Sequence, residues 1–262
     1  MRIARFKVDQ NVSFGEVVVS GDEVTVRALA GHPFEPPRYT GREFPITAVK
    51  LLAPVLPSKV VAIGKNYADH AAEVGGDVPV EPLIFLKPST AVIGPGAAIE
   101  LPPRSDRVDH EAELAVVIGK LCRDVPIDKV AEVILGYTCA NDVTARDLQF
   151  EDGQWTRAKG FDTFCPLGPW IETGLRLTGD NPDSLEVTCE VNGEVRQAGA
   201  TGDMVFPVDR IVSHVSSVMT LLPGDVILTG TPGGIGPIVE GDVVSITISG
   251  IGTLVNSAVL RV

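Results

Sequence analysis

Two runs rich in β-branched residues near the amino terminus are the first regular pattern in the chain. GEVVV (15–19) and EVTVRAL (23–29) flank a Ser20-Gly21-Asp22 turn, and this arrangement predicts a β-hairpin. The next stretch, GHPFEPPRYTGREFPI (31–46), is rich in proline and glycine, as is typical of a connector. We therefore expect residues 1–56 to form a small N-terminal β unit with its linker.

A second unit, expected over residues 57–262, opens with a short apolar strand at Val60–Ile63. The segment NYADHAAEVGG (66–76) then predicts a short helix. Asn66 is its candidate N-cap, its middle is rich in alanine, and Gly75-Gly76 would stop it. This unit should therefore mix helices with strands.

Further elements follow downstream. PIDKVAEVILGY (126–137) predicts a helix that runs into the strand YTCAND, and SLEVTCEVNGEVRQ (184–197) predicts a hairpin over Asn192-Gly193. VDRIVSHVSSVMTLLPGD (208–225) predicts a helix that ends before Pro223-Gly224. Its apolar residues at helical spacing are Ile211, Val215, Val218 and Leu222.

Strands outnumber helices in this pattern, and no regular βαβ alternation is present, so we predict a β-rich α+β fold. The composition supports this prediction, because 27 glycines and 20 prolines favour a turn-rich, strand-rich chain over a helical bundle. With 262 residues, 44% of them hydrophobic, the chain is long and apolar enough to bury a sizeable core.

Charge narrows the classes of partner. The formal net charge of −12 argues against nucleic acid or an anionic membrane surface as a partner. The four cysteines are widely spaced, which indicates reduced thiols rather than a thiolate metal site: Cys122, Cys139, Cys165 and Cys189. The amino terminus lacks an apolar signal core, and no stretch reaches the length of a membrane span. We expect a cytoplasmic protein.

The segment VDHEAELAVVIGK (108–120) places two carboxylates in front of an apolar strand. Glu111 and Glu113 are two residues apart, so on a strand they share a face with Ala115 and Val117. Carboxylates this close repel each other unless a cation lies between them, and oxygen ligands suit Mg²⁺, Mn²⁺ or Ca²⁺. Taken alone, the motif fits slightly better with an edge strand that has a solvated, charged face.

Polar residues also follow the predicted strand that ends at Asn141. Asp142 could complete a site of three carboxylates, and Arg146 could grip a substrate carboxylate, with Gln149 nearby. The alternative is an Asx turn followed by a solvated helix start.

Three more patterns contain residues that could take part in catalysis or ligand binding. Lys159 lies in an apolar, glycine-rich context that suggests a half-buried ammonium, although a surface lysine is the commoner case. The backbone of LTGTPGGIG (228–236) and the Thr231 hydroxyl could hold a carboxylate, or form only a hairpin turn. His70 and Glu73 would share a helix face and form a general base with its orienting carboxylate, unless they are a chance surface pair.

Several segments, taken together and in this order, resemble the fumarylacetoacetate hydrolase superfamily over roughly residues 57–262. They are GKNYADHAAE, FLKPST, DHEAELAVVIGK, NDVTARDLQ, AKGFDTFCPLGP, VNGEVRQ and LTGTPGGIG. The resemblance implies a β-rich α+β roll with a small N-terminal β extension, a homodimer, and a divalent metal, Mg²⁺ or Mn²⁺ with Ca²⁺ as a further option. It is most similar to the acylpyruvate hydrolase, oxaloacetate decarboxylase and 2-hydroxyhepta-2,4-diene-1,7-dioate isomerase members.

The same resemblance implies a role for nine residues. The metal ligands would be Glu111, Glu113 and Asp142; the active-site lysine Lys159; the substrate contacts Arg146, Gln149 and Thr231; and the lid pair His70 and Glu73. The implied substrates are small anionic 2-oxo or β-diketo acids, and the implied reaction is C–C bond hydrolysis or decarboxylation through an enolate. The alternatives are an isomerase of aromatic catabolism and a cation-binding module without activity.

Overall fold

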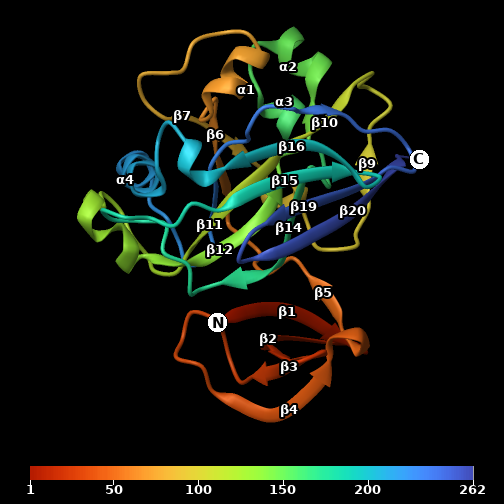
Figure 1. Cartoon of the computed structure of the whole chain (residues 1–262), viewed down its shortest axis with the longest axis vertical. Coiled ribbons are helices and arrows are strands. Elements are labelled where there is room, and N and C mark those ends of the chain that lie inside the picture. The colour runs from red at the N-terminus through yellow and green to blue at the C-terminus, as the bar shows by residue number, and fades with distance from the viewer. Residues whose placement is uncertain (262) are drawn as a thin grey trace.

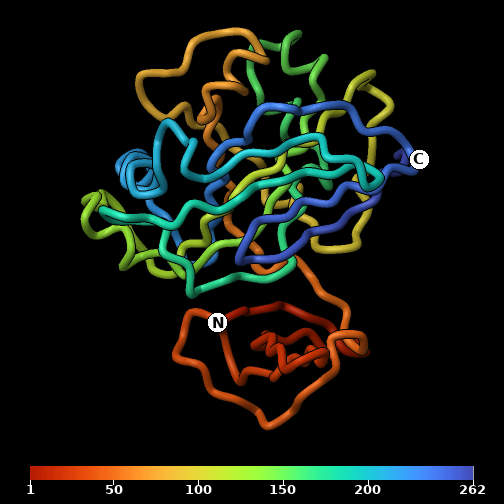
Figure 2. The backbone as a smooth tube through the Cα atoms, viewed as in Figure 1, coloured from red at the N-terminus to blue at the C-terminus, as the bar shows by residue number. Residues whose placement is uncertain are grey.

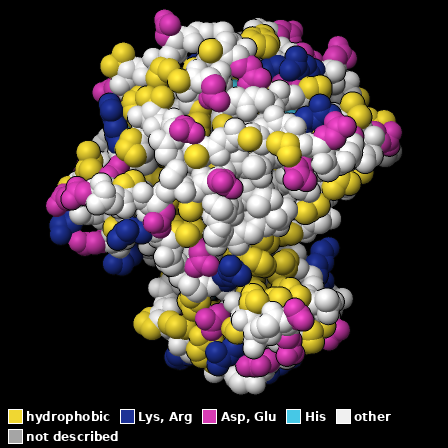
Figure 3. All heavy atoms as spheres, viewed as in Figure 1, with side chains coloured by type: hydrophobic (Ala, Val, Ile, Leu, Met, Phe, Trp, Pro, Cys, Tyr) yellow, Lys and Arg dark blue, Asp and Glu magenta, His cyan; other side chains and the backbone are white. Residues whose placement is uncertain are grey.

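The computed structural model describes residues 1–261. The chain forms a small N-terminal part and a larger body, with the amino terminus in the small part and the carboxyl end in the body (Figure 1). The backbone passes from one part to the other through a single extended segment after β5 (Lys50–Leu52), as the tube in Figure 2 shows. A narrow waist separates the parts, and acidic and basic side chains are scattered over the face seen in Figure 3.

The N-terminal part is an antiparallel meander. Its strands are β1 (Arg2–Val8), β2 (Asn11–Ser20), β3 (Glu23–Leu29) and β4 (Tyr39–Pro45), with β5 pairing on the other side of β1. The predicted hairpin is confirmed, since Ser20 pairs with Glu23 across a two-residue turn. The predicted connector is wrong in its second half, where β4 pairs with β3. The prolines of this stretch lie before β4 or at its last position, so they remove no hydrogen bond from its middle.

A continuous sheet joins this part to the body. The order is β4-β3-β2-β1-β14-β12-β11-β17-β6-β7, so β1 adds to the body's own strands. Those strands are β14 (Cys165–Glu172), β12 (Ile134–Asn141), β11 (Ala112–Ile118), β17 (Val226–Leu228), β6 (Val60–Gly64) and β7 (Leu83–Lys87). Glu172 strengthens the junction by accepting hydrogen bonds from the Met1 amine at 3.0 Å and from Arg2 at 3.3 Å.

Two further sheets complete the body. One has the order β16-β15-β19-β20-β9: β16 (Glu194–Ala200), β15 (Glu186–Val191), β19 (Val243–Ile248), β20 (Gly252–Leu260) and β9 (Ile99–Leu101). The other has the order β13-β10-β18: β13 (Thr144–Ala145), β10 (Val108–His110) and β18 (Gly236–Pro237). A short strand, β8 (Val92–Ile93), pairs with β14. The hairpin predicted over Asn192-Gly193 is confirmed as β15–β16, because Val191 pairs with Glu194.

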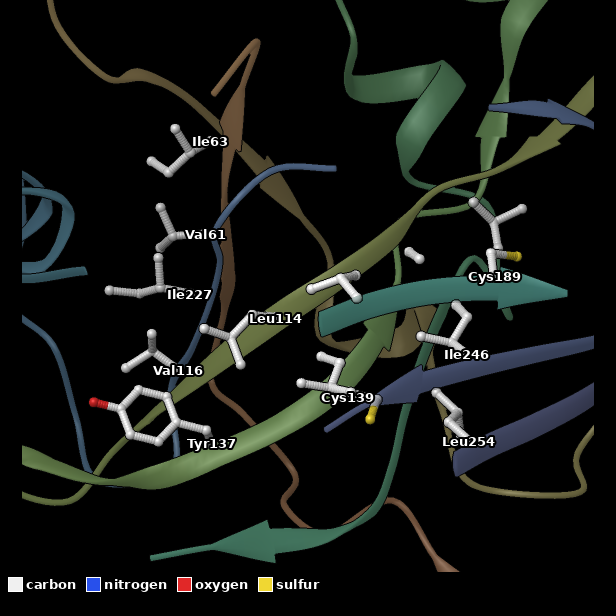
Figure 4. Close-up of a cluster of buried hydrophobic side chains, with 14 of the residues drawn as sticks. Val61, Ile63, Leu114, Val116, Tyr137, Cys139, Cys189, Ile227, Ile246 and Leu254 are labelled. Atoms are coloured by element: carbon white, nitrogen blue, oxygen red, sulfur yellow. The ribbon is translucent and has the colours of Figure 1, made fainter. Parts of the chain in front are cut away.

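The main core fills the space between the large sheet and the second one (Figure 4). Leu114 and Val116 of β11 and Cys139 of β12 face Cys189, Ile246 and Leu254 from the opposite sheet in this view. Ala115 and Val117, on the other face of β11, belong to a second buried cluster. β11 therefore lies in the middle of its sheet and is buried on both faces, which excludes an exposed edge strand.

The helices are short: α1 (Ala68–Glu73), α2 (Arg146–Asp152), α3 (Thr156–Lys159) and α4 (Val208–Val218), with 3-10 helices η1 (Ile46–Ala48), η2 (Ser89–Ala91), η3 (Ile127–Glu132) and η4 (Thr201–Asp203). Strands dominate, which confirms the predicted β-rich α+β class. Within residues 1–261, none of the helices has the length and apolar character needed to cross a membrane.

Three details of the helix predictions are wrong. Asn66 is not the N-cap of α1, because its buried side chain bonds to Phe206 and Thr229 instead. Residues 127–132 form the 3-10 helix η3, since β12 begins at Ile134 and leaves room for less than two α-turns after Pro126. α4 ends at Val218, so Leu222 lies outside it.

Candidate active site

A pocket with a volume of about 190 Å³ lies at the end of the body that carries α1, α2 and α3, far from the N-terminal part in Figure 1. Its wall combines carboxylates, cations, an imidazole and aromatic rings. The wall includes these residues expected from the sequence: His70, Glu111, Glu113, Asp142, Arg146, Gln149, Lys159 and Thr231. The structure thus brings together side chains from five separate stretches of the chain, while Glu73 does not line the pocket.

Strand pairing creates the acidic cluster. Ala112 of β11 pairs with Asn141 of β12, so Glu111 and Glu113 meet Asp142, which directly follows β12. The Asp142 N–H donates to the Glu111 carbonyl at 2.9 Å and fixes this approach. One carboxylate oxygen from each of the three acids lies within 4.8 Å of the others, and their exposed fractions are only 1–3%. The solvated edge strand considered for Glu111 and Glu113 is therefore wrong.

Two lysines neutralise part of this cluster. Lys159, the last residue of α3, donates to Glu111 at 2.7 Å and to Asp142 at 2.6 Å, so it is not the surface lysine of the alternative interpretation. Lys87, the last residue of β7, donates to the other Asp142 oxygen at 2.6 Å and to the Val143 carbonyl at 3.1 Å. Sequence reasoning did not single out Lys87. The available signal was a lone charge at the end of the apolar run LIFLK.

Arg146 begins α2, and each of its guanidinium nitrogens already has a partner. It donates to Asp109 at 2.9 Å, to Gln149 at 2.5 Å, and to Glu111 through a short ion pair. Asp109 also accepts two hydrogen bonds from Arg107. This network anchors Arg146 at the pocket wall. A ligand could accept hydrogen bonds from the guanidinium N–H groups that remain free.

The pKa values of Glu111 and Glu113 are shifted in opposite directions. Burial alone would raise the pKa of Glu111, but the charges of Lys159 and Arg146 outweigh burial and hold this pKa below its ordinary value. Burial raises the pKa of Glu113 well above its ordinary value, and the neighbouring Asp142 and Glu111 charges add to the effect. Glu113 has no cationic partner among the described ion pairs and accepts one hydrogen bond, from the Gly230 N–H. A divalent cation would relieve this repulsion, so the cluster fits a hard metal ion.

The glycine-rich loop after β17 packs against the acidic cluster. The Gly230 N–H reaches Glu113 at 2.6 Å, and a Cβ at Gly230 would come 2.7 Å from Asn66 Cβ, so this approach requires glycine. The Thr231 hydroxyl is buried and accepts a hydrogen bond from Gln197 at 2.8 Å. Gln197, which sequence reasoning missed, also accepts from the Ala112 N–H at 3.0 Å. The loop leads from β17 to β18, which belong to different sheets, so it is not a hairpin turn.

α1 is docked on the same loop. Asp69 accepts from the Gly233 N–H at 3.0 Å, and Glu73 accepts from the Gly234 N–H at 3.1 Å. His70 is buried at 6% exposure, so it is not a chance surface residue. Its Nδ1 lies 3.7 Å from Glu73 Oε2, too far for a hydrogen bond, and has no other partner among the described residues.

Burial lowers the pKa of His70, and the surrounding charges oppose one another: Glu111 and Glu73 raise this pKa, whereas Lys159 and Arg146 lower it. The imidazole is therefore neutral near pH 7. A neutral ring nitrogen on a pocket wall can accept a proton from a bound molecule.

A buried pocket that joins carboxylates, ammonium groups and an imidazole is typical of an enzyme active site. The family described as Fumarylacetoacetate (FAA) hydrolase C-terminal matches residues 59–259, and the chain belongs to this family of enzymes. A second family, described as Rv2993c-like, N-terminal, matches residues 1–54.

Three relatives illustrate the range of named activities. The 5-carboxymethyl-2-hydroxymuconate delta-isomerase structure from Mycobacterium smegmatis is 54% identical, with a TM-score of 0.92 over 100% of both chains. The mitochondrial oxaloacetate tautomerase Fahd2a of Rattus norvegicus is 44% identical over 82% of this chain and 71% of its own length. Maleylpyruvate hydrolase from Sphingobium sp. SYK-6, in complex with manganese(II) and pyruvate, is 32% identical, with a TM-score of 0.78 over 100% of both chains.

Proposed function

We propose that this protein is a divalent-metal-dependent enzyme that acts on 2-oxo or β-diketo acids through an enolate. The observation that carries the proposal is the cluster of Glu111, Glu113 and Asp142, three buried carboxylates within 4.8 Å of one another. The proposal is supported by relatives named for oxaloacetate tautomerisation, muconate isomerisation and maleylpyruvate hydrolysis, because 2-oxo acid or enol chemistry is common to those names.

In this proposal Glu111, Glu113 and Asp142 hold Mg²⁺ or Mn²⁺, with Ca²⁺ as a further option. Their all-oxygen donor set suits these hard ions, and the relative solved with manganese(II) favours Mn²⁺ as the first ion to test. The bound ion would supply Lewis-acid polarisation of the substrate's 2-oxo group.

The chain's own residues would do the rest. Lys159 remains an ammonium: burial would lower its pKa, but the carboxylates of Asp142 and Glu111 outweigh burial and raise it. It can therefore stabilise negative charge that develops on a substrate oxygen beside it. Arg146, Gln149 and Thr231 line the same wall and would orient the substrate carboxylate with their free hydrogen-bonding groups.

For hydrolysis, His70 would take a proton from a water molecule as the water oxygen attacks the distal carbonyl carbon. The C–C bond then breaks, its electron pair passes into the enolate, and a proton returns to carbon to release the second acid. Glu73, 3.7 Å from the imidazole, would stabilise the imidazolium formed in the first step. Burial of His70 favours its neutral, proton-accepting form.

The second candidate is an isomerase or tautomerase. The specific observation in its favour is the 54% identity, over the whole chain, to a structure named as a delta-isomerase. This reaction moves a proton and a double bond and needs no activated water. It would use Lys159 and the acidic cluster but not the base role of His70.

One experiment separates the candidates. Purified protein is assayed with Mg²⁺ and Mn²⁺ against acetylpyruvate, oxaloacetate and a hydroxymuconate, and the same panel is repeated with His70→Ala. Loss of acetylpyruvate cleavage in the variant supports hydrolysis, whereas unchanged turnover removes the water-activating role of His70. Absence of turnover of any 2-oxo acid with either ion would overturn the proposed function. A crystal soaked with oxalate should show two oxalate oxygens on the ion.

We also propose that the protein is a homodimer. β7 ends the large sheet, and its Leu83 and Leu86 are 41% and 46% exposed, so an apolar strand edge is available for contact with a second copy. Light scattering coupled to size-exclusion chromatography should give twice the mass of 27.7 kDa. A monomeric mass at micromolar concentration would contradict the dimer.

A further inference from the structure

The outer part of the pocket carries a cation that the proposed chemistry does not use. Lys65 follows β6 directly and lines the same cavity as the acidic cluster. Its ammonium donates a hydrogen bond to the Gly75 carbonyl at 3.3 Å, and it has no ion-pair partner among the described residues. The other lining cations, Lys159 and Arg146, are both paired with carboxylates. Lys65 is therefore available to bind an anion.

The backbone holds Lys65 in an uncommon conformation. Its φ of 56° is in the left-handed region, which only a few per cent of residues other than glycine adopt. Gly76, with a φ of 139°, faces the ammonium: a Cβ there would come 2.5 Å from Lys65 Nζ. Glycine at this position leaves room for the ammonium beside the segment that follows α1. The chain thus keeps Lys65 at the pocket although this costs backbone strain.

Charge on the pocket wall points to a dianion. The lining residues include three carboxylates and three cations, so the formal charges of these six side chains cancel. A divalent ion held by the carboxylates would leave a net charge of plus two. That charge is balanced by a ligand with two negative groups, one at the ion and one at Lys65.

Part of the same pocket wall is apolar. Ile63, Phe85 and Trp155 line the cavity, and the rings of Phe85 and Trp155 meet edge to face with their centroids 5.2 Å apart. Such a wall suits a short carbon chain rather than a further polar group.

We propose that Lys65 binds the outer acidic group of the substrate and makes the enzyme selective for 2-oxo diacids over acids with one carboxylate. This inference rests on the proposed function, since it assumes that the first acidic group binds at the metal end. The Gly75 carbonyl positions the ammonium before the substrate enters. The outer carboxylate then accepts a hydrogen bond from the same ammonium and is held close to the segment after α1.

The test uses a matched pair of ligands, a 2,4-dioxo diacid and its terminal monomethyl ester. These two compounds differ in the outer negative charge and in one added methyl group. Wild-type protein loaded with Mn²⁺ should bind and turn over the diacid better than the ester. Lys65→Met should lower affinity and kcat/KM for the diacid by roughly 10- to 100-fold, the size expected for a charge-assisted hydrogen bond. It should change both values for the ester by less than about threefold.

Three controls make the test specific. Lys65→Arg keeps the positive charge and should keep the preference for the diacid. Lys129→Met removes a lysine that is 56% exposed on η3 and should change neither ligand's values. Mn²⁺ affinity, measured by titration calorimetry without substrate, should be equal in wild type and Lys65→Met, which shows that the metal end is intact.

The two proposals can fail separately. Equal loss for diacid and ester in Lys65→Met, or equal use of both ligands by wild type, would overturn the role of Lys65 and leave the proposed function standing. Absence of turnover by wild type would overturn the proposed function. In that case calorimetric binding of the two ligands still decides the role of Lys65, because the preference for the diacid is measured directly.

Discussion

Lys87 donates a hydrogen bond to Asp142 over 2.6 Å, with both side chains almost completely buried. Removing Lys87 leaves Lys159 as the remaining ammonium partner of Asp142 in an acidic interior, and a broken buried pair typically costs up to about 3–5 kcal/mol. We therefore expect Lys87→Met to lower the free energy of unfolding of the metal-free protein by an amount of this order. Urea denaturation followed by circular dichroism measures the change.

Excess Mn²⁺ should restore part of the stability of Lys87→Met, because the ion would supply positive charge to Asp142 and binds only the folded state. Lys129→Met, at an exposed pair with Glu132, should change stability by less than about 0.5 kcal/mol. A loss for Lys87→Met no larger than for this control would show that the buried pair does not stabilise the site.

Glu113→Gln tests the acidic cluster directly. The substitution keeps the side-chain shape and an oxygen that can accept from the Gly230 N–H, but it removes a charge that burial and two neighbouring carboxylates disfavour. We expect the metal-free variant to be at least as stable as wild type and to bind Mn²⁺ at least about 10-fold more weakly. Calorimetric titration and thermal unfolding with and without Mn²⁺ give both values.

The matched control for this variant is Glu194→Gln, where the carboxylate is 73% exposed and pairs with Arg196. It should bind the ion as wild type does. Wild-type affinity in Glu113→Gln would remove Glu113 from the ligand set.

Two substitutions of Glu73 distinguish the effect of its charge on His70 from its role in holding α1 against the loop. Glu73→Gln keeps an oxygen for the Gly234 N–H but loses the carboxylate charge near His70, whereas Glu73→Ala loses both. Loss of about 1 kcal/mol of ion-pair stabilisation predicts a roughly fivefold lower kcat for acetylpyruvate cleavage in Glu73→Gln. For Glu73→Ala we expect a larger fall in kcat together with a higher KM, because α1 loses a contact to the loop.

His70→Ala in the same assay should lower kcat by about 10²- to 10⁴-fold, as expected for loss of a general base. Steady-state kinetics of the three variants supply the comparison. Equal kcat values in Glu73→Gln and wild type would assign Glu73 to docking alone.

Local patterns in the sequence predicted much of this molecule. The Gly21 and Asn192-Gly193 hairpins were predictable because two-residue turns depend on the turn residues themselves. The acidic cluster was predictable only when the family resemblance was added to the spacing of Glu111 and Glu113. The reason is that the same spacing occurs on solvated edge strands, and burial depends on which strands flank β11.

Three of the misses share a cause, since β4, Asn66 and Lys87 each depend on other parts of the chain. β4 forms because β3 offers it an edge, despite the prolines around it. Asn66 was expected to cap α1 but bonds to Thr229, which is 163 residues away. Lys87 reaches Asp142 across 55 residues, so a lone lysine at the end of an apolar strand could be interpreted only after folding.

Asp225 lies outside the acidic cluster and allows a test of how the free energy of unfolding depends on pH. Its side chain is fully buried and accepts hydrogen bonds from Ser58 and from the Leu222 N–H, and it forms a short ion pair with Lys59. Burial alone would raise the pKa of Asp225, but the bonds from Lys59 and Ser58 outweigh burial and lower it. The carboxylate therefore ties the start of β6 to the turn before β17.

Because the folded-state pKa of Asp225 is lowered, its stabilising contribution is present above the unfolded-state pKa of about 3.9 and is lost as the pH falls through the folded-state pKa. Asp225→Asn should lower the free energy of unfolding by roughly 2–3 kcal/mol between pH 5 and pH 7, and the difference from wild type should shrink below about pH 4. Denaturant titrations at pH 7, 5, 4 and 3 measure this difference in the free energy of unfolding.

The control is Asp180→Asn, at an exposed site, whose free energy of unfolding should follow that of wild type at every pH. A difference between Asp225→Asn and wild type that stays constant down to pH 3 would show that the lost contacts do not depend on ionisation of this carboxylate.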